Sequence, residues 1–447
     1  MLKTFPKGGV HPEENKLSAS SPIEIIAPQE KALYAIPISQ HIGAPAKVVV
    51  KKNDVVKVGT LLAQSGGFVS ANIHSSVSGK VKKIDYITDT SGYKREAVII
   101  QADGEDQWEE NINRGDELLK DIDLNSEEIK KKISDFGIVG LGGATFPSHV
   151  KLSIPDGEKA EYLMLNGVEC EPYLTSDHRM MLEKGEEIMV GTQILMKALG
   201  VSKAMIGIEN NKSDAIKNMT ALASKYDGIT VHALKVQYPQ GGEKQLISAL
   251  IGKEVPSGKL PIHVGCVVHN VGTAYAVYEA VQKNKPLLER VVTLTGKSVE
   301  KPANYMVRMG TPIEHLIERS GGVPEDTGKL ISGGPMMGKA IESTDVPVTK
   351  GTSGILILKN NEAKRGSINP CIRCAKCVSV CPAGLEPFLL MTFGEKRLWE
   401  KAGEEDAMDC IECGSCSFTC PSDRPLLDYI RLDKSKIIEI RRKNSTK

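Results

Sequence analysis

This chain of 447 residues lacks several features that would assign it to a class at once. Its 57 Lys and Arg residues nearly balance its 56 Asp and Glu residues. The net charge of +1 gives no overall field that would attract nucleic acid or an anionic membrane surface, so we expect no nucleic-acid partner. No apolar run approaches the ~18 residues of a membrane-spanning helix, so no transmembrane segment is predicted. The N-terminal residues also lack the apolar stretch of a secretory signal, and a reducing, cytosolic setting is therefore expected.

Cysteine, by contrast, is present in an informative pattern. Eight of the ten cysteines fall into two runs, each with the spacing C-x2-C-x2-C-x3-C-P. In a two-cluster bacterial ferredoxin, three thiolates of such a run hold one [4Fe-4S] cube and the fourth crosses to the other cube. Zinc is the alternative, but structural zinc sites use four ligands in two separated pairs. The expected cluster ligands are Cys371, Cys374, Cys377 and Cys381 in the first run, and Cys410, Cys413, Cys416 and Cys420 in the second.

Residues 30–105 follow an N-terminal arm, residues 1–29, and are predicted to form a small β-rich barrel. Short runs of β-branched residues alternate with glycines at the expected corners. The pattern V-x-x-G-x-x-L-A followed by S-x-x-x-G-x-V resembles the lipoyl and biotinyl carrier fold. Carriers present a lysine at the hairpin tip, whereas this chain has GGFVSAN there, with Phe68 near the expected position. Because the acyl-carrying amine is missing, we expect a scaffold without carrier function.

Residues 125–290 are predicted to form an α/β domain with a Rossmann-like parallel sheet. Strand-like runs (YLMLNGV, AMIGIE and ITVHALK) alternate with helix-like runs (EEIMVGTQILMKALG, SDAIKNMTALASKY and EKQLISALIG), which is typical of βαβ units. The first helix is expected after Asn125, because Glu128 completes an N-capping pattern. Ligands of such sheets bind beyond the carboxyl ends of the strands, so the loops after YLMLNGV and ITVHALK are candidate binding loops.

The remaining segments complete a multidomain fold. Residues 291–345 contain a strand pair, a helix near Pro312 and a closing strand, and they resemble the β-grasp fold of SLBB domains. Residues 346–364 are expected to link this module to residues 365–430, where a helical stretch between the cysteine runs predicts a helical dicluster ferredoxin domain. The basic stretch 431–447 is expected to be a solvated helix end.

A glycine-rich segment lies near the start of the α/β domain. The sequence GIVGLGGATFPSHVK places Gly140, Gly142 and Gly143 ahead of Lys151. Glycines allow backbone N–H groups to approach a phosphate or an aromatic ring, and the lysine could add positive charge. A helix is predicted immediately before the segment, so it is not the Rossmann fingerprint, which follows a strand. On its own the segment could equally be a structural turn.

Together with the cysteine runs, four loops resemble the flavin- and NADH-binding subunit of respiratory complex I. The segments GLGGATFPSHVK, NGVECEP, YPQGGE and HNVGT match that family's loops G-x-G-G-A-G-F-P-x-x-x-K, N-x-D-E-x-E-P, Y-x-x-G-E-E and N-N-V-E-T, in the same order. The resemblance implies that FMN is held by Gly140, Gly142, Gly143, Lys151, Asn166, Gly241, Asn270 and Thr273. It places Phe146, Glu169, Glu171 and Glu243 near the nicotinamide dinucleotide, with Tyr238 in the same matched set. The acidic wall of that pocket is expected to be thinner than in the family, because Leu141, Val168, Gly242 and Gly272 replace charged residues.

From TFPKGGVHP onward, the whole chain resembles the C subunits of Rnf complexes, which are membrane-bound ferredoxin:NAD oxidoreductases that export Na+ or H+. The resemblance implies an electron-transfer enzyme subunit that passes electrons between NAD(H), FMN and two [4Fe-4S] clusters. It also implies a peripheral position on the cytoplasmic face of the membrane, beside the membrane and iron-sulfur subunits of the complex. Two alternatives stay open: a cobalamin reductase built from the same parts, and a non-catalytic scaffold whose clusters only relay electrons. Cys170, Cys266 and the nine histidines show no ligand spacing and are expected to be structural.

Overall fold

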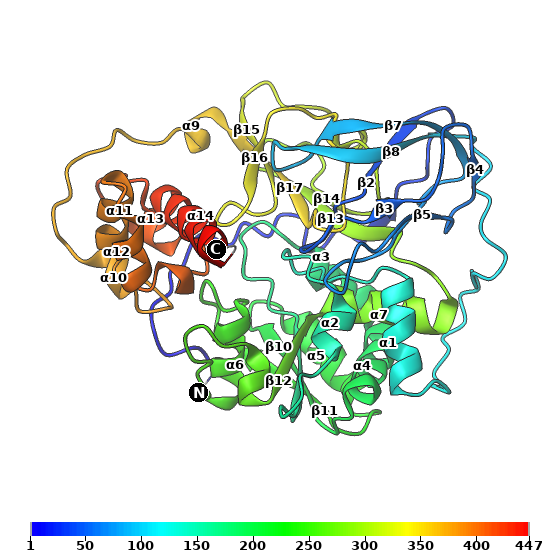
Figure 1. Ribbon diagram of the computed structural model, residues 1–447, viewed down its shortest axis with the longest axis horizontal. Helices are drawn as coiled ribbons and strands as arrows, with labels where there is room; N and C mark the ends of the chain where they lie inside the picture. Colours follow the sequence, from blue (N-terminus) through cyan, green and yellow to red (C-terminus); the bar gives the residue numbers. More distant parts are fainter. Residues whose placement is uncertain (1, 446–447) are drawn as a thin grey trace.

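The computed structural model describes residues 2–445, which form four units. Figure 1 shows the β-grasp strands (yellow) between the barrel (blue) and the cysteine-rich helices (orange and red), with the α/β unit below them. Residues 446 and 447, which belong to the predicted basic stretch, and Met1 of the predicted arm lie outside the described residues. Among the helices of residues 2–445, none combines the length and the apolar composition that crossing a bilayer requires.

The predicted barrel is present and consists of two small antiparallel sheets, with strand orders β2-β8-β7-β4 and β3-β5-β6. Buried side chains such as Tyr34 and Leu62 fill the space between the sheets. Phe68, at the tip where carriers have their lysine, is exposed, and its carbonyl accepts a hydrogen bond of 2.9 Å from His149 of the α/β unit. The strands are β2 (Leu33–Pro37), β3 (Lys47–Val48), β4 (Val55–Val56), β5 (Leu61–Gln64), β6 (Ile73–His74), β7 (Gly79–Thr88) and β8 (Lys94–Ala102).

The α/β unit is built on a parallel sheet with the order β11-β10-β9-β12. The chain adds β10 and β11 on one side of β9 and then places β12 on the other side, so the strand order reverses between β9 and β12. Ligand-binding crevices form at such a switch point, beyond the carboxyl ends of the strands. The strands are β9 (Tyr162–Asn166), β10 (Ala204–Glu209), β11 (Ile229–Leu234) and β12 (Cys266–Asn270). The helices are α1 (Ser126–Asp135), α2 (Ser148–Leu152), α3 (Ser176–Glu183), α4 (Gly185–Leu199), α5 (Ser213–Ala223), α6 (Glu243–Ile251), the 3-10 helix η1 (Pro261–Val264) and α7 (Val271–Lys283).

Local sequence explains where several of these elements begin and end. The predicted capping pattern at α1 is confirmed: the Asn125 side chain accepts from the N–H groups of Glu127 and Glu128, and the Glu128 carboxylate accepts from the Asn125 N–H. Such a cap contributes about 1 kcal/mol. At the other end of the unit's longest helix, Gly200 adopts a φ of +67° and terminates α4. The predicted strands β9, β10 and β11 and helices α4, α5 and α6 are all present, whereas β12 and α7 were not predicted from the sequence.

The β-grasp unit is a six-stranded mixed sheet with the order β1-β14-β13-β17-β15-β16 and helix α8 packed against it. It is larger than the predicted segment 291–345. The prediction of a linker is wrong for residues 354–359, which form a strand parallel to β13 and antiparallel to β15. A strand of the N-terminal arm, parallel to β14, also joins the sheet. The elements are β1 (Ile23–Ile25), β13 (Glu289–Thr295), β14 (Ala303–Arg308), α8 (Ile313–Arg319), β15 (Thr327–Ser332), β16 (Lys339–Ile341) and β17 (Gly354–Lys359).

The cysteine-rich unit is helical, as predicted. Its long last helix packs along two shorter helices through a buried cluster that includes Leu390, Ala402 and Ile437. The prediction that residues from 431 onward form a solvated helix end is therefore wrong for the part that includes Ile437. The helices of this unit are α10 (Lys376–Ser379), α11 (Pro387–Glu395), α12 (Trp399–Glu404), the 3-10 helix η2 (Ala407–Asp409), α13 (Ser415–Thr419) and α14 (Leu426–Ser445). The short helix α9 (Asn360–Ala363) precedes them and packs against β15 and β17 of the β-grasp unit.

Candidate functional site

The glycine-rich segment forms a tight loop beside the switch point of the sheet. The Gly140 N–H donates to the Phe146 carbonyl at 2.9 Å, which closes the loop. Gly143 has a φ of +115°, and a Cβ atom there would meet no atom within 4 Å, so its backbone faces open space. The Leu141 N–H donates to Thr273 Oγ1 at 2.9 Å, which ties the loop to the first turn of α7. The loop therefore presents bare backbone near the carboxyl end of β12.

Two asparagines at the ends of neighbouring strands lie beside this loop. Asn166 ends β9 and Asn270 ends β12, and the Asn270 side chain donates to the Asn166 carbonyl at 3.3 Å. The Asn166 side chain donates to the Gly241 carbonyl at 2.8 Å, which brings in the loop before α6. A Cβ atom on Gly142 would lie 3.4 Å from Asn270 Cβ, at van der Waals contact, so the loop lies directly against Asn270. The four loops singled out in the sequence thus converge at the switch point, and we call the space between them the flavin crevice.

Lys151 brings a positive charge to the flavin crevice. Its Nζ pairs with Glu243 at 2.7 Å and donates to the Val268 carbonyl at 3.0 Å. His269, the next residue of β12, is buried, and neither of its ring nitrogens has a hydrogen-bond partner among the described residues. Burial, followed by the charge of Lys151, lowers the pKa of His269 to about 3, so this imidazole is neutral.

An unpartnered buried imidazole calls for a polar group that the chain itself does not supply, because buried polar atoms are normally hydrogen-bonded. Beside Lys151 and bare loop backbone, His269 fits a ring cofactor that carries a phosphate. The sequence analysis treated His269 as structural. Its position directly before Asn270 in the matched HNVGT loop is the signal that could have identified it.

Three side chains expected near the dinucleotide make contacts elsewhere in the chain. The Glu169 carboxylate accepts from backbone N–H groups in the first turn of α3. The Glu171 carboxyl accepts from the N–H groups of Met336 and the next residue, in a turn of the β-grasp unit. Tyr238 Oη donates to the Cys413 carbonyl at 2.7 Å. Glu171 and Tyr238 join the α/β unit to its neighbours, whereas Glu169 is bound within that unit. Glu243 and Phe146 are the members of the set that stay with the loops of the crevice.

Asp177 belongs to the site although the sequence analysis missed it. Its carboxyl accepts from the Asn270 side-chain amide at 2.6 Å and so orients that amide. Burial, followed by the nearby charge of Glu169, raises the pKa of Asp177 to about 7, while Arg290 acts in the opposite direction. No motif marks Asp177, because it lies in α3 between two of the matched loops.

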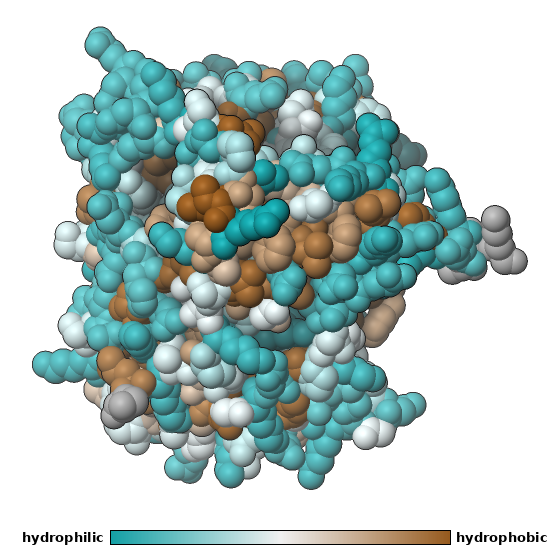
Figure 2. All heavy atoms as spheres, turned by 90° about the vertical axis from the view of Figure 1, so that its left-hand side faces the viewer, coloured by the Kyte–Doolittle hydropathy of each residue, from teal (hydrophilic) through white to brown (hydrophobic). Residues whose placement is uncertain are grey.

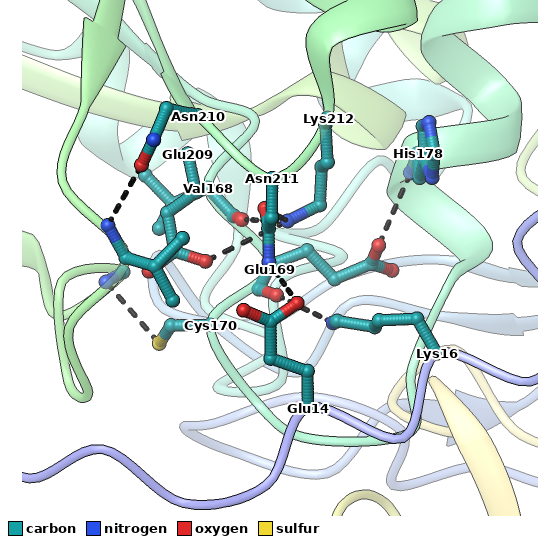
Figure 3. A network of polar contacts seen from close by, with 12 residues as sticks. Glu14, Lys16, Val168, Glu169, Cys170, His178, Glu209, Asn210, Asn211 and Lys212 are labelled. Atoms are coloured by element: carbon teal, nitrogen blue, oxygen red, sulfur yellow. Dashed lines mark hydrogen bonds and ion pairs between the residues drawn. The ribbon is translucent and has the colours of Figure 1, made fainter.

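Lys16 of the N-terminal arm supports the loop after β9 (Figure 3). Its Nζ donates to the carbonyls of Glu169, Glu171 and Leu174 at 2.8, 2.9 and 2.6 Å. Burial, followed by the charge of Lys212, lowers the pKa of Lys16 to about 8. A cavity of about 260 Å³, lined in part by Lys16, lies between the arm and the carboxyl ends of β10 and β11. The arm thus fixes the backbone of a loop that contributes Glu169 and Glu171.

A second buried lysine holds the same loop from the α5 side. Lys212 pairs with Glu209 at 3.6 Å and donates to the Val168 carbonyl at 2.8 Å. The thiol of Cys170, in the same loop, accepts from the Gly241 N–H at 3.2 Å (Figure 3). Burial raises the pKa of Cys170 well above its ordinary value, so it is a neutral structural thiol.

The cysteines of the two runs are free thiols that fall into two groups. In the first group, burial and then the neighbouring thiols of Cys410, Cys413 and Cys381 raise the pKa of Cys416 to about 12. The fourth cysteine of the first run therefore lies with the first three of the second run. We call Cys381, Cys410, Cys413 and Cys416 the inner thiol group.

The other four cysteines also come from both runs. Burial raises the pKa of Cys377, and the neighbouring thiols of Cys420 and Cys371 add to that increase. We call Cys371, Cys374, Cys377 and Cys420 the outer thiol group. This pairing agrees with the crossing expected of a two-cluster ferredoxin. Within residues 2–445, no three His, Cys, Asp or Glu side chains are close enough to share a single metal ion, and a cube does not require this, because each thiolate binds a different iron.

Comparison with protein families defines the class of this chain. Residues 133–279 match the Nuo51 FMN-binding domain, and residues 370–424 match the 4Fe-4S dicluster domain. Residues 3–105 match the RnfC barrel sandwich hybrid domain, and residues 291–340 match the SLBB domain. The protein is thus a multidomain electron-transfer protein with an FMN-binding fold and a dicluster fold. The predicted fold class and the predicted FMN and [4Fe-4S] cofactors are confirmed.

Curated relatives narrow the class to one family. The chain is 47% identical over 440 residues to the C subunit of the proton-translocating ferredoxin:NAD(+) oxidoreductase complex of Clostridium ljungdahlii, covering 98% of this chain and 94% of that one. It is 44% identical over 439 residues to the C subunit of the Na(+)-translocating ferredoxin:NAD(+) oxidoreductase complex of Acetobacterium woodii, covering 98% of each. It is 42% identical to the C subunit of the ion-translocating oxidoreductase complex of Rhodobacter capsulatus, over 98% of this chain and 84% of that one. The chain belongs to the family of C subunits of ion-translocating ferredoxin:NAD oxidoreductase complexes, the Rnf complexes.

Proposed function

We propose that this chain is the NAD(H)-reacting electron-transfer subunit of an ion-translocating ferredoxin:NAD oxidoreductase. The observation that carries the proposal is the contact between the two redox units. Tyr238, from a matched flavin loop, donates a 2.7 Å hydrogen bond to the carbonyl of Cys413 in the inner thiol group. The flavin crevice and one cluster site are thus joined through a single side chain, which is the arrangement that electron transfer between them requires.

The residues of the crevice have distinct proposed roles. Bound FMN would supply two-electron exchange with nicotinamide and one-electron exchange with the clusters. Lys151 and the neutral His269 would meet its phosphate and polar ring edges, and Asp177 would keep the Asn270 amide oriented. We assign the cofactor-binding residues as Gly140, Gly142, Gly143, Phe146, Lys151, Asn166, Gly241, Glu243, Asn270 and Thr273, and leave out Glu169, Glu171 and Tyr238, whose side chains are bound to other groups of the chain.

Selectivity between the two nicotinamide dinucleotides follows from the charge near the crevice. Glu243 lies at the crevice, and Glu169 lies in the loop after β9. Negative charge there disfavours the additional phosphate of NADPH by like-charge repulsion. We therefore propose NADH rather than NADPH as the substrate.

The subunit would work at a membrane without crossing it. We place it on the cytoplasmic face, held by the membrane and iron-sulfur subunits of the complex. This position is supported by the family, whose named members belong to ion-translocating complexes.

Flavin stoichiometry and nucleotide preference test this function. Purified protein with both clusters reconstituted should bind one FMN per chain non-covalently, and NADH should bleach the flavin absorbance faster than NADPH does. Equal rates with the two nucleotides would contradict the selectivity argument. A reconstituted chain that takes up iron and no flavin would instead be the non-catalytic relay scaffold. A matched comparison of Lys151→Met with Lys131→Met, on the exposed face of α1, should show weaker FMN retention for the first variant alone, with unchanged iron content.

A further inference from the structure

The two cysteine runs have nearly the same sequence pattern but very different surroundings. All thirteen residues from 364 to 376, which include the first two ligands of the outer thiol group, are exposed. In the second run, residues 413–416 are all buried. The reason is local: Tyr238 contacts Cys413, and a Cβ atom on Gly414 would lie 2.9 Å from the Met336 carbonyl. The α/β and β-grasp units thus cover the inner thiol group, while no other unit of the described chain covers segment 364–376.

Apolar side chains surround the outer thiol group at the surface. Ile368 and Ile372 are 64% and 68% exposed, and Phe418, two residues before Cys420, is 54% exposed. Phe388, which is 39% exposed, donates its backbone N–H to the Cys377 thiol. Figure 2, seen from the side where Figure 1 places the cysteine-rich helices, shows apolar patches between hydrophilic side chains on this side of the molecule. Four large exposed apolar side chains around one redox site are typical of an interaction surface.

Segment 364–376 carries charge of one sign, although the acidic Asp423 and Asp428 lie against it. Segment 364–376 contains four basic residues and no acidic residue. Arg365 pairs with Asp428 at 2.6 Å. Among the described residues, the side chains of Lys364, Arg373 and Lys376 have no ion pair or hydrogen bond, so three positive charges are available to a partner. We call the apolar residues above together with these three cations the outer cluster face.

We propose that the outer cluster face is the docking surface for an acidic one-electron iron-sulfur protein or domain, and that the outer cluster is the point at which electrons enter or leave this subunit. The proposal rests on the proposed function, because it assumes that the outer thiol group holds a cube. Electrons must pass between redox centres over short distances, so a partner has to cover the exposed ligands closely. The available charges favour a negatively charged partner and speed its encounter. A lipid surface would match the charge and the apolar groups, but it has no redox centre to place beside the cluster.

Binding of a purified acidic two-cluster ferredoxin, measured by isothermal titration calorimetry with both proteins oxidised, tests the proposal. The dissociation constant should rise as ionic strength increases, because exposed charges are screened. The double reversal Arg373→Glu with Lys376→Glu should weaken binding by about tenfold or more. The matched control is Lys82→Glu with Lys94→Glu, two exposed lysines on the barrel, and it should bind like the unmodified chain.

A second variant tests whether weaker binding of the first variant results from loss of the cluster. Lys364→Glu with Ile368→Ser changes the outer cluster face without touching residues between the cysteines, and it should also weaken binding at unchanged iron content. Ferredoxin binding that is insensitive to both variants, or equally sensitive to the barrel control, would overturn the proposal. So would variants that lose affinity for vesicles of anionic phospholipid, or that convert a dimer of this chain to a monomer, while ferredoxin binding is unchanged. The calorimetric measurement needs no flavin. A chain that fails to react with NADH but binds ferredoxin through this face would therefore refute the proposed function and leave the docking proposal intact.

Discussion

Two carboxyl groups near the flavin crevice are held where ionisation is unfavourable. Burial raises the pKa of Glu171 to about 7, although two backbone N–H groups of the β-grasp turn partly favour its charged form. Burial likewise raises the pKa of Asp177, which orients Asn270. Both carboxyl groups hold neighbouring groups in place. Glu171 joins the α/β unit to the β-grasp turn, and Asp177 orients the side-chain amide of Asn270. A protonated carboxyl can do this in a buried site at a lower desolvation cost than a carboxylate can.

The raised pKa of Glu171 predicts how stability depends on pH. Between the ordinary pKa of about 4.5 and the folded value of about 7, the folded chain binds more protons than the unfolded chain, so stability falls as pH rises through this window. The loss from this one group is on the order of 3 kcal/mol. In thermal unfolding from pH 5 to pH 8, the midpoint of the unmodified chain should fall relative to that of Glu171→Gln as pH rises, because the comparison isolates this one group. The exposed control Glu110→Gln should follow the unmodified chain at every pH, and a constant difference between Glu171→Gln and the unmodified chain would contradict the assignment.

At the scale of single residues, the sequence predicted which loops form the crevice but not which groups each side chain contacts. Glycines and asparagines act here through the backbone, and Gly142, Asn166 and Asn270 lie together at the switch point. Glu171 was expected to face the dinucleotide and instead binds N–H groups 165 residues further along the chain. A partner so distant in sequence depends on how whole units dock, and no local pattern encodes it.

Among the elements, the N-terminal arm connects more units than its few hydrogen bonds suggest. Its Gly9 N–H donates to the Val380 carbonyl at 2.9 Å beside the inner thiol group, and Val10 forms a bridge with Tyr238. Further along, Lys16 holds the loop after β9, and β1 extends the β-grasp sheet. The arm therefore fastens the cluster unit to the flavin crevice, which fixes the separation across which electrons must pass.

Substitution of Gly9 tests this role of the arm. Gly9 has a φ of +91°, and an added Cβ atom would lie 2.6 Å from Gln237 Nε2 and 2.9 Å from the Tyr238 carbonyl oxygen. Gly92 has a φ of +77°, and no atom lies within 4 Å of an added Cβ, so a substitution there adds the strain of a left-handed backbone but no steric clash. Gly9→Ala should lower the free energy of unfolding by about 1 to 3 kcal/mol more than Gly92→Ala does. It should also expose the arm to limited proteolysis, and equal behaviour of the two variants would show that the arm tolerates displacement.

Elements with their own periodicity and caps were predictable, and those made by distant pairing were not. The α1 cap and the runs of β9, β10 and β11 follow from neighbouring residues. Strands β1 and β17 join a sheet whose other members lie far away in sequence, and their short apolar runs give no sign of a partner. For the same reason the segment containing β17 was predicted to be a linker.

On the scale of the whole molecule, the units form an ordered path. The flavin crevice lies at the switch point of the α/β sheet, the inner thiol group lies next to it through Tyr238, and the outer thiol group lies at the surface. Crossing of the two cysteine runs ties both cluster sites into one folding unit, so neither can move relative to the crevice independently. The cysteine spacing predicted this crossing, while the difference between a covered and an exposed cluster site arises only from the docking of the units.

The most direct measurement starts from protein that carries FMN and both clusters, with the clusters chemically reduced. On addition of NAD+, the account predicts that the paramagnetic signals of both reduced clusters disappear, and that one NADH and the uptake of one proton accompany each pair of electrons lost. The same protein stripped of FMN should keep its clusters reduced and form no NADH. Clusters that stay reduced in the complete protein, or NADH formation at the same rate without FMN, would contradict the account.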